Sequence, residues 1–96
     1  MRITKEDMSD AVACYMRAAE SLGMVKAGHT LHCVEGSKAL GNGFKLVWVD
    51  NESGGNTHAP GTDYNGFIGW TKREALEKIY TITRSFEEVH LHLMGN

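Results

Sequence analysis

The chain has 96 residues and a mass of 10.6 kDa, which suits a single domain covering residues 1–96. Its composition, 42% hydrophobic and 23% charged, is that of an ordinary globular protein and excludes a disordered or collagen-like chain. The formal net charge is −2 and no basic block occurs, which argues against nucleic-acid binding driven by phosphate neutralisation. Apolar runs are short, and the N-terminus lacks the apolar stretch of a signal peptide. We therefore expect a cytoplasmic protein that makes no membrane contact.

Residues 5–22 are predicted to form an amphipathic helix. Thr4 is expected to cap it, although Asp7 is shorter than the glutamate that usually completes a capping box. Gly23 is expected to end it, with Met24 folding back onto the last turn. Apolar side chains recur at steps of three and four, which places them on one face: Met8, Ala11, Val12, Tyr15, Ala18, Ala19 and Leu22.

The pattern then changes to the period of two that is typical of strands. Residues 29–35 and residues 44–50 each predict a strand. Asn42-Gly43 is a strong tight-turn signal, so the two strands are expected to pair as an antiparallel hairpin. An extension of the first strand through residues 38–40, with a bulge at Gly36, is left open. Residues 67–69 predict a short third strand.

Residues 51–66 form the most unusual segment of the sequence. They have no periodicity, and they are rich in glycine and asparagine. Structureless segments of this length are rare inside a small domain and are often functional. His58 and Tyr64 are the side chains in this segment best suited to contact a partner.

Thr71 begins the second helix. Thr71-Lys72-Arg73-Glu74 matches the capping-box pattern, and helix-forming residues follow. An apolar stripe then continues at helical spacing to the C-terminus. The alternation of residues 89–93 also suits a strand, but no turn signal separates them from the helix, so we favour one long helix.

These elements predict an α+β fold in the order helix, three antiparallel strands, helix. Both helices are expected to cover one face of the sheet, because each must bury an apolar stripe. The other face would then be partly exposed. It would carry Val47 and Val49, and Val34 beside them.

The sequence contains no recognisable catalytic or cofactor-binding pattern. Cys14 and Cys33 are expected to be buried, reduced thiols, with a single disulfide as the minor alternative. His32 and Cys33 point to opposite faces of a strand, so they do not make a metal-ligand pair. No nucleophile motif or complete phosphate-binding loop occurs. We therefore expect no catalytic residues, no cofactor and no metal. A small metal-dependent or hydrolytic enzyme remains as the second alternative function.

The order of elements is also that of double-stranded RNA-binding domains. The start of the second helix, Thr71-Lys72-Arg73-Glu74-Ala75, resembles the basic helix start with which those domains hold phosphates. That resemblance implies a nucleic-acid-binding module as the alternative function. The residues it would use are Lys38, Lys45, Lys72 and Arg73. Glu74, Glu77, Glu87 and Glu88 make the rest of this helix acidic.

Residues 36–84 resemble, in style, small accessory proteins encoded by bacteriophages of actinobacteria. The features that carry the resemblance are the compact hairpin, the Gly/Pro loop, the Phe-Ile-Gly-Trp-Thr step and the Thr-x-Arg-Glu-Ala helix start. It implies a non-enzymatic protein of the host cytoplasm that binds a host or viral protein. We expect that unidentified partner to contact the 51–66 loop and the open sheet face, through His58, Tyr64, Val47 and Val49. A homodimer is left open.

Overall fold

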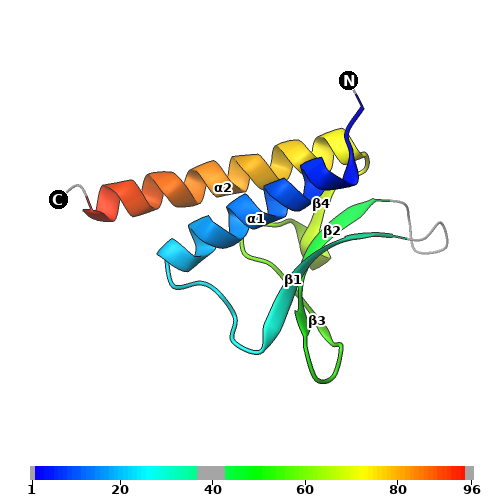
Figure 1. Cartoon of the computed structure of the whole chain (residues 1–96), viewed down its shortest axis with the longest axis horizontal. Helices are drawn as coiled ribbons and strands as arrows, with labels where there is room; N and C mark the ends of the chain where they lie inside the picture. The colour runs from blue at the N-terminus through cyan, green and yellow to red at the C-terminus, as the bar shows by residue number, and fades with distance from the viewer. Residues whose placement is uncertain (1, 37–42, 95–96) are drawn as a thin grey trace.

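A computed structural model describes residues 2–36 and 43–94 of the chain. It confirms the α+β fold, with two helices covering one face of an antiparallel sheet (Figure 1). The elements in chain order are α1 (Lys5–Ser21), β1 (His29–Glu35), β2 (Phe44–Asp50), β3 (Asn56–His58), the 3₁₀ turn η2 (Tyr64–Gly66), β4 (Phe67–Gly69) and α2 (Lys72–Met94).

Helix α1 is closed at both ends by its own sequence. Its capping box is complete: the Asp7 amide donates to Thr4 Oγ1 over 3.2 Å, and the Thr4 amide donates to Asp7 Oδ2 over 2.8 Å. The short side chain of Asp7 is therefore long enough. Gly23 follows the helix with φ of 68°, and the Met24 amide donates to the carbonyl of Ala19 over 2.9 Å. This is the expected glycine stop.

Strand β2 is the centre of the sheet. β1 pairs along one side of it, antiparallel, from His29 opposite Asp50 to Glu35 opposite Phe44. On the other side, β3 pairs with the second half of β2 and β4 with its start. The expected hairpin and the strand at residues 67–69 are confirmed. The turn between β1 and β2, with Asn42, Lys38 and the proposed extension through residues 38–40, lies outside the described residues.

The description of residues 51–66 as structureless is wrong. Residues 56–58 form β3, opposite Val47–Val49, and residues 64–66 form η2. The sheet therefore has four strands. Periodicity did not reveal β3 because it has three polar residues, all exposed, and its pairing to β2 is made by the backbone.

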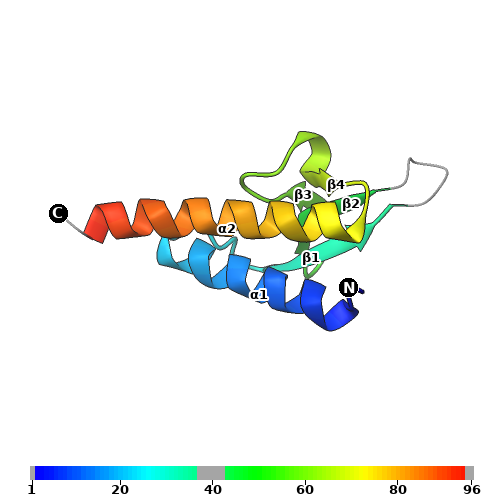
Figure 2. The same cartoon turned by 90° about the horizontal axis from the view of Figure 1, so that it is seen from above.

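One core lies between the helices and the sheet. Tyr15, Leu46 and Ile79 are its largest fully buried side chains, and they come from α1, β2 and α2. The two helices lie side by side and run in the same direction (Figures 1 and 2). The rings of Tyr15 and Phe86 meet edge to face, with centroids 5.3 Å apart. The Tyr15 hydroxyl also donates to the carbonyl of Pro60 over 2.7 Å, which fastens the 59–62 segment beneath the helices.

Helix α2 continues to Met94, so the long helix is confirmed and the strand alternative for residues 89–93 is wrong. The Glu74 amide donates to Thr71 Oγ1 over 3.1 Å, as expected for an N-cap. Toward the C-terminus the apolar side chains become exposed, and Leu91 and Leu93 are 67% and 68% exposed. Within residues 2–36 and 43–94, neither helix combines the length and apolar character that spanning a membrane requires.

Candidate functional site

The face of the sheet that the helices leave uncovered is less open than the sequence suggested. Val47 is only 4% exposed, so its expected exposure is wrong, and Val49 is half-buried. The covering comes from β3 and η2. At Gly66, a side-chain Cβ would lie 3.1 Å from a methyl group of Val47, so the backbone of η2 packs directly on the valine. Val34 of β1 is 36% exposed.

A surface hollow of about 340 Å³ lies on this face, beside the covered valine. Strands β1, β2 and β3 and the turn η2 all contribute to its wall. Its lining residues are Val34, Lys45, Val47, Asn56, Thr57, His58 and Asn65. His58, which the sequence singled out, is therefore placed at the hollow together with Val47. Their role in binding a partner stays a prediction.

Tyr64 directly precedes Asn65, which lines this hollow, and its side chain is 86% exposed. The turn around Tyr64 is closed by two hydrogen bonds, from Asp63 N–H to the carbonyl of Phe67 and from Gly66 N–H to the carbonyl of Asp63, each 3.0 Å long. Asn65 has a left-handed conformation with φ of 56°, which asparagine tolerates better than most residues. The phenol is thus presented from a defined turn and does not depend on a flexible loop.

A second exposed aromatic side chain is Trp70, between β4 and α2. Phe67 is half-buried and Trp70 is 61% exposed. Their rings pack with centroids 4.9 Å apart. Gly43 leaves room for them, because a Cβ at that position would lie 2.9 Å from the Phe67 ring and 3.4 Å from the Trp70 ring. Position 43 has the same strand parity as Lys45, so both rings lie on the uncovered face.

We call this surface the outer face, and its residues are Lys45, Val47, His58, Tyr64, Phe67 and Trp70. The exposed position of Trp70 comes with the packing of its ring on Phe67, which no local pattern in the sequence indicates. The uncovered position of Phe67 follows from its pairing with Lys45, which the sequence does not show.

The four residues of the nucleic-acid alternative do not form one basic surface. Lys38 lies outside the described residues. Lys45 belongs to the outer face, whereas Lys72 lines a groove with Leu31 and Phe44, on the helix side of the sheet. Arg73 is exposed in the first turn of α2. The sheet thus separates Lys45 from Lys72.

The cysteines are free and half-buried, and they come from different elements. Burial raises the pKa of the Cys33 thiol. Cys14 accepts a hydrogen bond of 3.2 Å from Arg17 Nη2. His32 is exposed, on the face of β1 opposite to Cys33. Over the described ranges, no three histidine, cysteine, aspartate or glutamate side chains gather into a group that could hold a metal ion.

The other shifted ionisable groups have structural partners. Burial raises the pKa of Tyr15, whose hydroxyl is bonded to Pro60. Hydrogen bonds from the backbone N–H groups of Glu52 and Ser53 lower the pKa of Asp50, and His29, 3.9 Å away, adds to this effect. These bonds hold the turn that follows β2. Neither group faces the hollow of the outer face.

Comparison with known proteins adds no relative: no protein family, curated protein or solved structure matches the chain. The site is therefore interpreted from its own chemistry.

Proposed function

We propose that this is a non-enzymatic accessory protein that binds a partner protein through its outer face. The observation that carries the proposal is the pair of exposed aromatic side chains Tyr64 and Trp70, which are 86% and 61% exposed. Tyr64 precedes Asn65, which lines the hollow of about 340 Å³, and the Trp70 ring packs on Phe67. Aromatic side chains are enriched at the energetic centres of protein interfaces. The backbone of Tyr64 belongs to the 3₁₀ turn η2, and the Trp70 ring packs on the Phe67 ring, so the chain that carries both aromatic residues is ordered before binding.

The character of the surrounding residues supports a protein partner more than a nucleic acid. Lys45 is the only lysine or arginine among the residues that define the outer face, and His58, Asn56 and Thr57 around the hollow are uncharged or weakly basic. Such a surface suits aromatic contacts with a polar rim. The resemblance to phage accessory proteins makes the cytoplasm of an actinobacterial host the proposed setting, and a host protein the first partner to seek.

The test is capture from an actinobacterial lysate, with the purified protein as bait. We expect Tyr64→Ala with Trp70→Ala to reduce the captured partner by about tenfold or more, which is typical of losing an interface centre. The matched control replaces two exposed apolar residues outside the outer face, Leu91→Ala with Leu93→Ala, and should capture as the wild type does. Equal capture by both double variants would place the interface elsewhere.

A salt series separates the alternative function. Phosphate-driven binding weakens steeply as salt rises, whereas contacts made by aromatic side chains change little. Capture that persists at high salt and after nuclease treatment supports the protein partner. Loss of capture under both conditions would favour the nucleic-acid alternative.

A further inference from the structure

The sheet has one long edge without a neighbour among the described residues. β1 pairs only with β2, and no backbone hydrogen bond joins its other side to another described segment. The direction of its backbone groups follows from the ladder. Asn51 N–H donates to Gly28, and Gly36 N–H donates to Gly43, so the even-numbered residues of β1 are those bonded to β2. His29, Leu31, Cys33 and Glu35 therefore direct their N–H and C=O groups outward.

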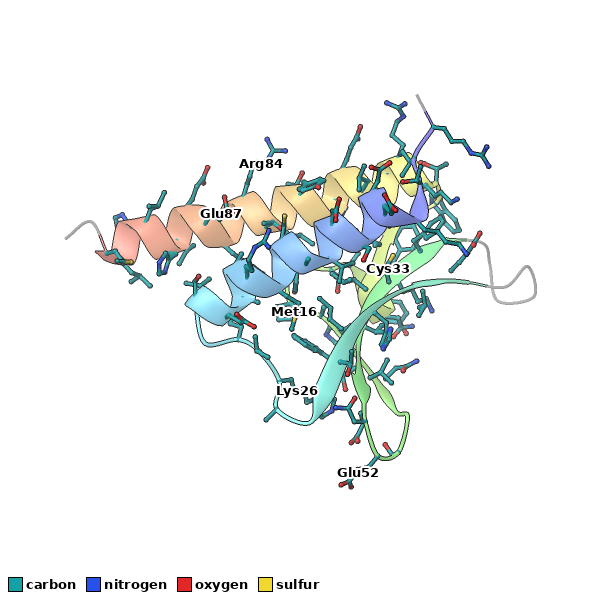
Figure 3. All side chains as sticks on the ribbon, in the orientation of Figure 1. Met16, Lys26, Cys33, Glu52, Arg84 and Glu87 are labelled. Carbon is teal, nitrogen blue, oxygen red and sulfur yellow. The ribbon has the colours of Figure 1, made fainter. Side chains whose placement is uncertain are left out.

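A groove runs along this free edge. It has a volume of about 430 Å³ and lies between β1 and the first half of α1. Met8 and Val12 of α1 and Leu31 of β1 give it an apolar lining. Seen from above, α1 lies along the side of β1 that faces away from β2, and does not cover the middle of the sheet (Figure 2). Cys33 lies on the strand below α1 (Figure 3).

The spacing of the layers explains why the groove exists. Neighbouring strands lie about 4.8 Å apart, while packed helices lie about 8–10 Å apart. Two packed helices are therefore about as wide as a sheet of four neighbouring strands. Here β3 and β4 share one position, end to end beside β2, so the layer below the helices is one strand short on the β1 side. Met8, Val12 and Met16 are accordingly only half-buried.

The charge of the groove is positive at one end. Lys5 and Lys72, from the first turns of the two helices, both line it, and Glu35 is the one carboxylate among its lining residues. Among the described residues, neither Lys5 nor Lys72 takes part in an ion pair, whereas His29 pairs with Asp50 and Lys78 with Asp63. The two lysines thus have no acidic partner within the described chain, and a carboxylate from outside would complement them.

We propose that the free edge of β1 and the underside of α1 bind an extended, acidic segment of a partner protein as an additional β-strand. Its backbone would bond to the outward groups of Leu31 and Cys33, and alternate side chains would enter the groove against Met8 and Val12. A carboxylate would lie near Lys5 and Lys72. This site is separate from the outer face, and it stands or falls independently of the function proposed above.

A second copy of this chain fits the edge less well. In a symmetric pairing of two β1 strands, both α1 helices would lie above the same junction. Each already extends past its own β1, so the two helices would need the same space. A single extended segment brings no such helix with it, and its backbone offers the donors and acceptors that the edge lacks.

The experiment selects from a displayed library of random ten-residue peptides, with the intact protein as target. We expect enriched peptides to alternate β-branched or aromatic residues with others, and to carry at least one acid. In NMR spectra such a peptide should shift the amides of Leu31, Cys33 and Glu35 more than those of the outer face. No enrichment, or shifts confined to the outer face, would overturn the proposal.

Two variants test the mode of binding. Cys33→Pro removes one outward N–H that takes no part in pairing with β2, and should weaken the peptide by about tenfold. Lys5→Glu with Lys72→Glu should weaken acidic peptides to a similar extent. This double variant is expected to fold, because acidic residues suit the first turn of a helix. It therefore still tests the proposal if Cys33→Pro does not fold. Lys26→Glu, away from the groove (Figure 3), is the matched control and should bind normally.

Two results would contradict this assignment. One is a peptide affinity that neither Cys33→Pro nor the double charge reversal changes. The other is a dimer in sedimentation that Cys33→Pro dissociates, because the edge would then be occupied by a second copy.

Discussion

The two edges of the sheet are built differently. The edge formed by β1 is one strand of seven residues, whereas the opposite edge is divided between β3 and β4, of three residues each. Short edge strands are a common protection against unwanted pairing between chains. The long edge lacks that protection, and its charges and groove suit a specific strand instead. The difference indicates that the divided edge serves the fold and the long edge is available for binding.

The glycines show the same contrast. On the divided edge, Gly66 is packed so closely that a Cβ would lie 2.8 Å from the carbonyl oxygen of Leu46. Gly28, at the start of β1, has a similar positive φ but no heavy atom within 4 Å of a Cβ built on it. Close packing therefore requires glycine at position 66, beside the divided edge. At position 28, just before the long edge, there is space for a larger side chain.

The largest effect is expected where both edges depend on one side chain. Leu46 of β2 is fully buried, and β2 pairs with both edges. Leu46→Ala should lower the free energy of unfolding by about 3 kcal/mol, through lost burial and the cavity left behind. Urea unfolding measures this. Val34→Ala, at a position 36% exposed on β1, is the control and should cost less than about 1 kcal/mol. A similar small cost at Leu46 would mean that the core does not hold the two edges together.

The next effect separates the edges directly. Gly66→Ala should cost about 2 kcal/mol or more, because the positive φ is unfavourable for alanine and the new methyl group meets the Leu46 carbonyl. Gly28→Ala meets only the first of these penalties, and should cost about 1 kcal/mol. Thermal or urea melts of the pair provide the comparison. Equal costs would show that the close packing of η2 on β2 does not contribute to stability.

The helix caps should not distinguish the edges. α1 lies beside the long edge, and α2 follows directly from β4 of the divided edge. In both caps the threonine hydroxyl accepts a backbone hydrogen bond, of 3.2 Å at Thr4 and 3.1 Å at Thr71, whereas the reciprocal bond to the threonine amide is made at Thr4. Thr71→Ala and Thr4→Ala should each cost about 1 kcal/mol, measured by urea melts. An unchanged midpoint for either variant would show that its hydroxyl does not stabilise the helix.

The smallest effect concerns the thiol at the long edge. Burial raises the pKa of Cys33, so less of the reactive thiolate forms at a given pH, and a thiol reagent should label it slowly in the native state. Labelling should accelerate in denaturant and as the pH rises. The unfolded chain loses this proton first, so the same group should slightly lower stability as the pH rises above the ordinary thiol range. Mass spectrometry after timed labelling measures the rate, and rapid native labelling of Cys33 would contradict its burial.

Local patterns in the sequence were sufficient for the elements that are long and amphipathic. The two helices, the pairing of β1 with β2 and both N-caps follow from periodicity and from capping residues such as Thr4 and Thr71, because these signals act within a few residues of each other. His58 and Tyr64 could also be singled out in advance as exposed side chains of a special segment, and both are exposed.

Only the tertiary structure decided the rest. β3 forms because its three polar residues pair through their backbone with β2. This pairing leaves no hydrophobic periodicity in the sequence. Val47 is buried because η2 packs on it. Trp70 is exposed, and its ring lies over Gly43, where the absence of a side chain leaves room for it. The groove at β1 depends on β3 and β4 sharing a single position in the sheet. Each of these features arises from contacts between segments that are distant in the sequence. Such contacts decide which side chains are buried, and local sequence patterns do not contain them.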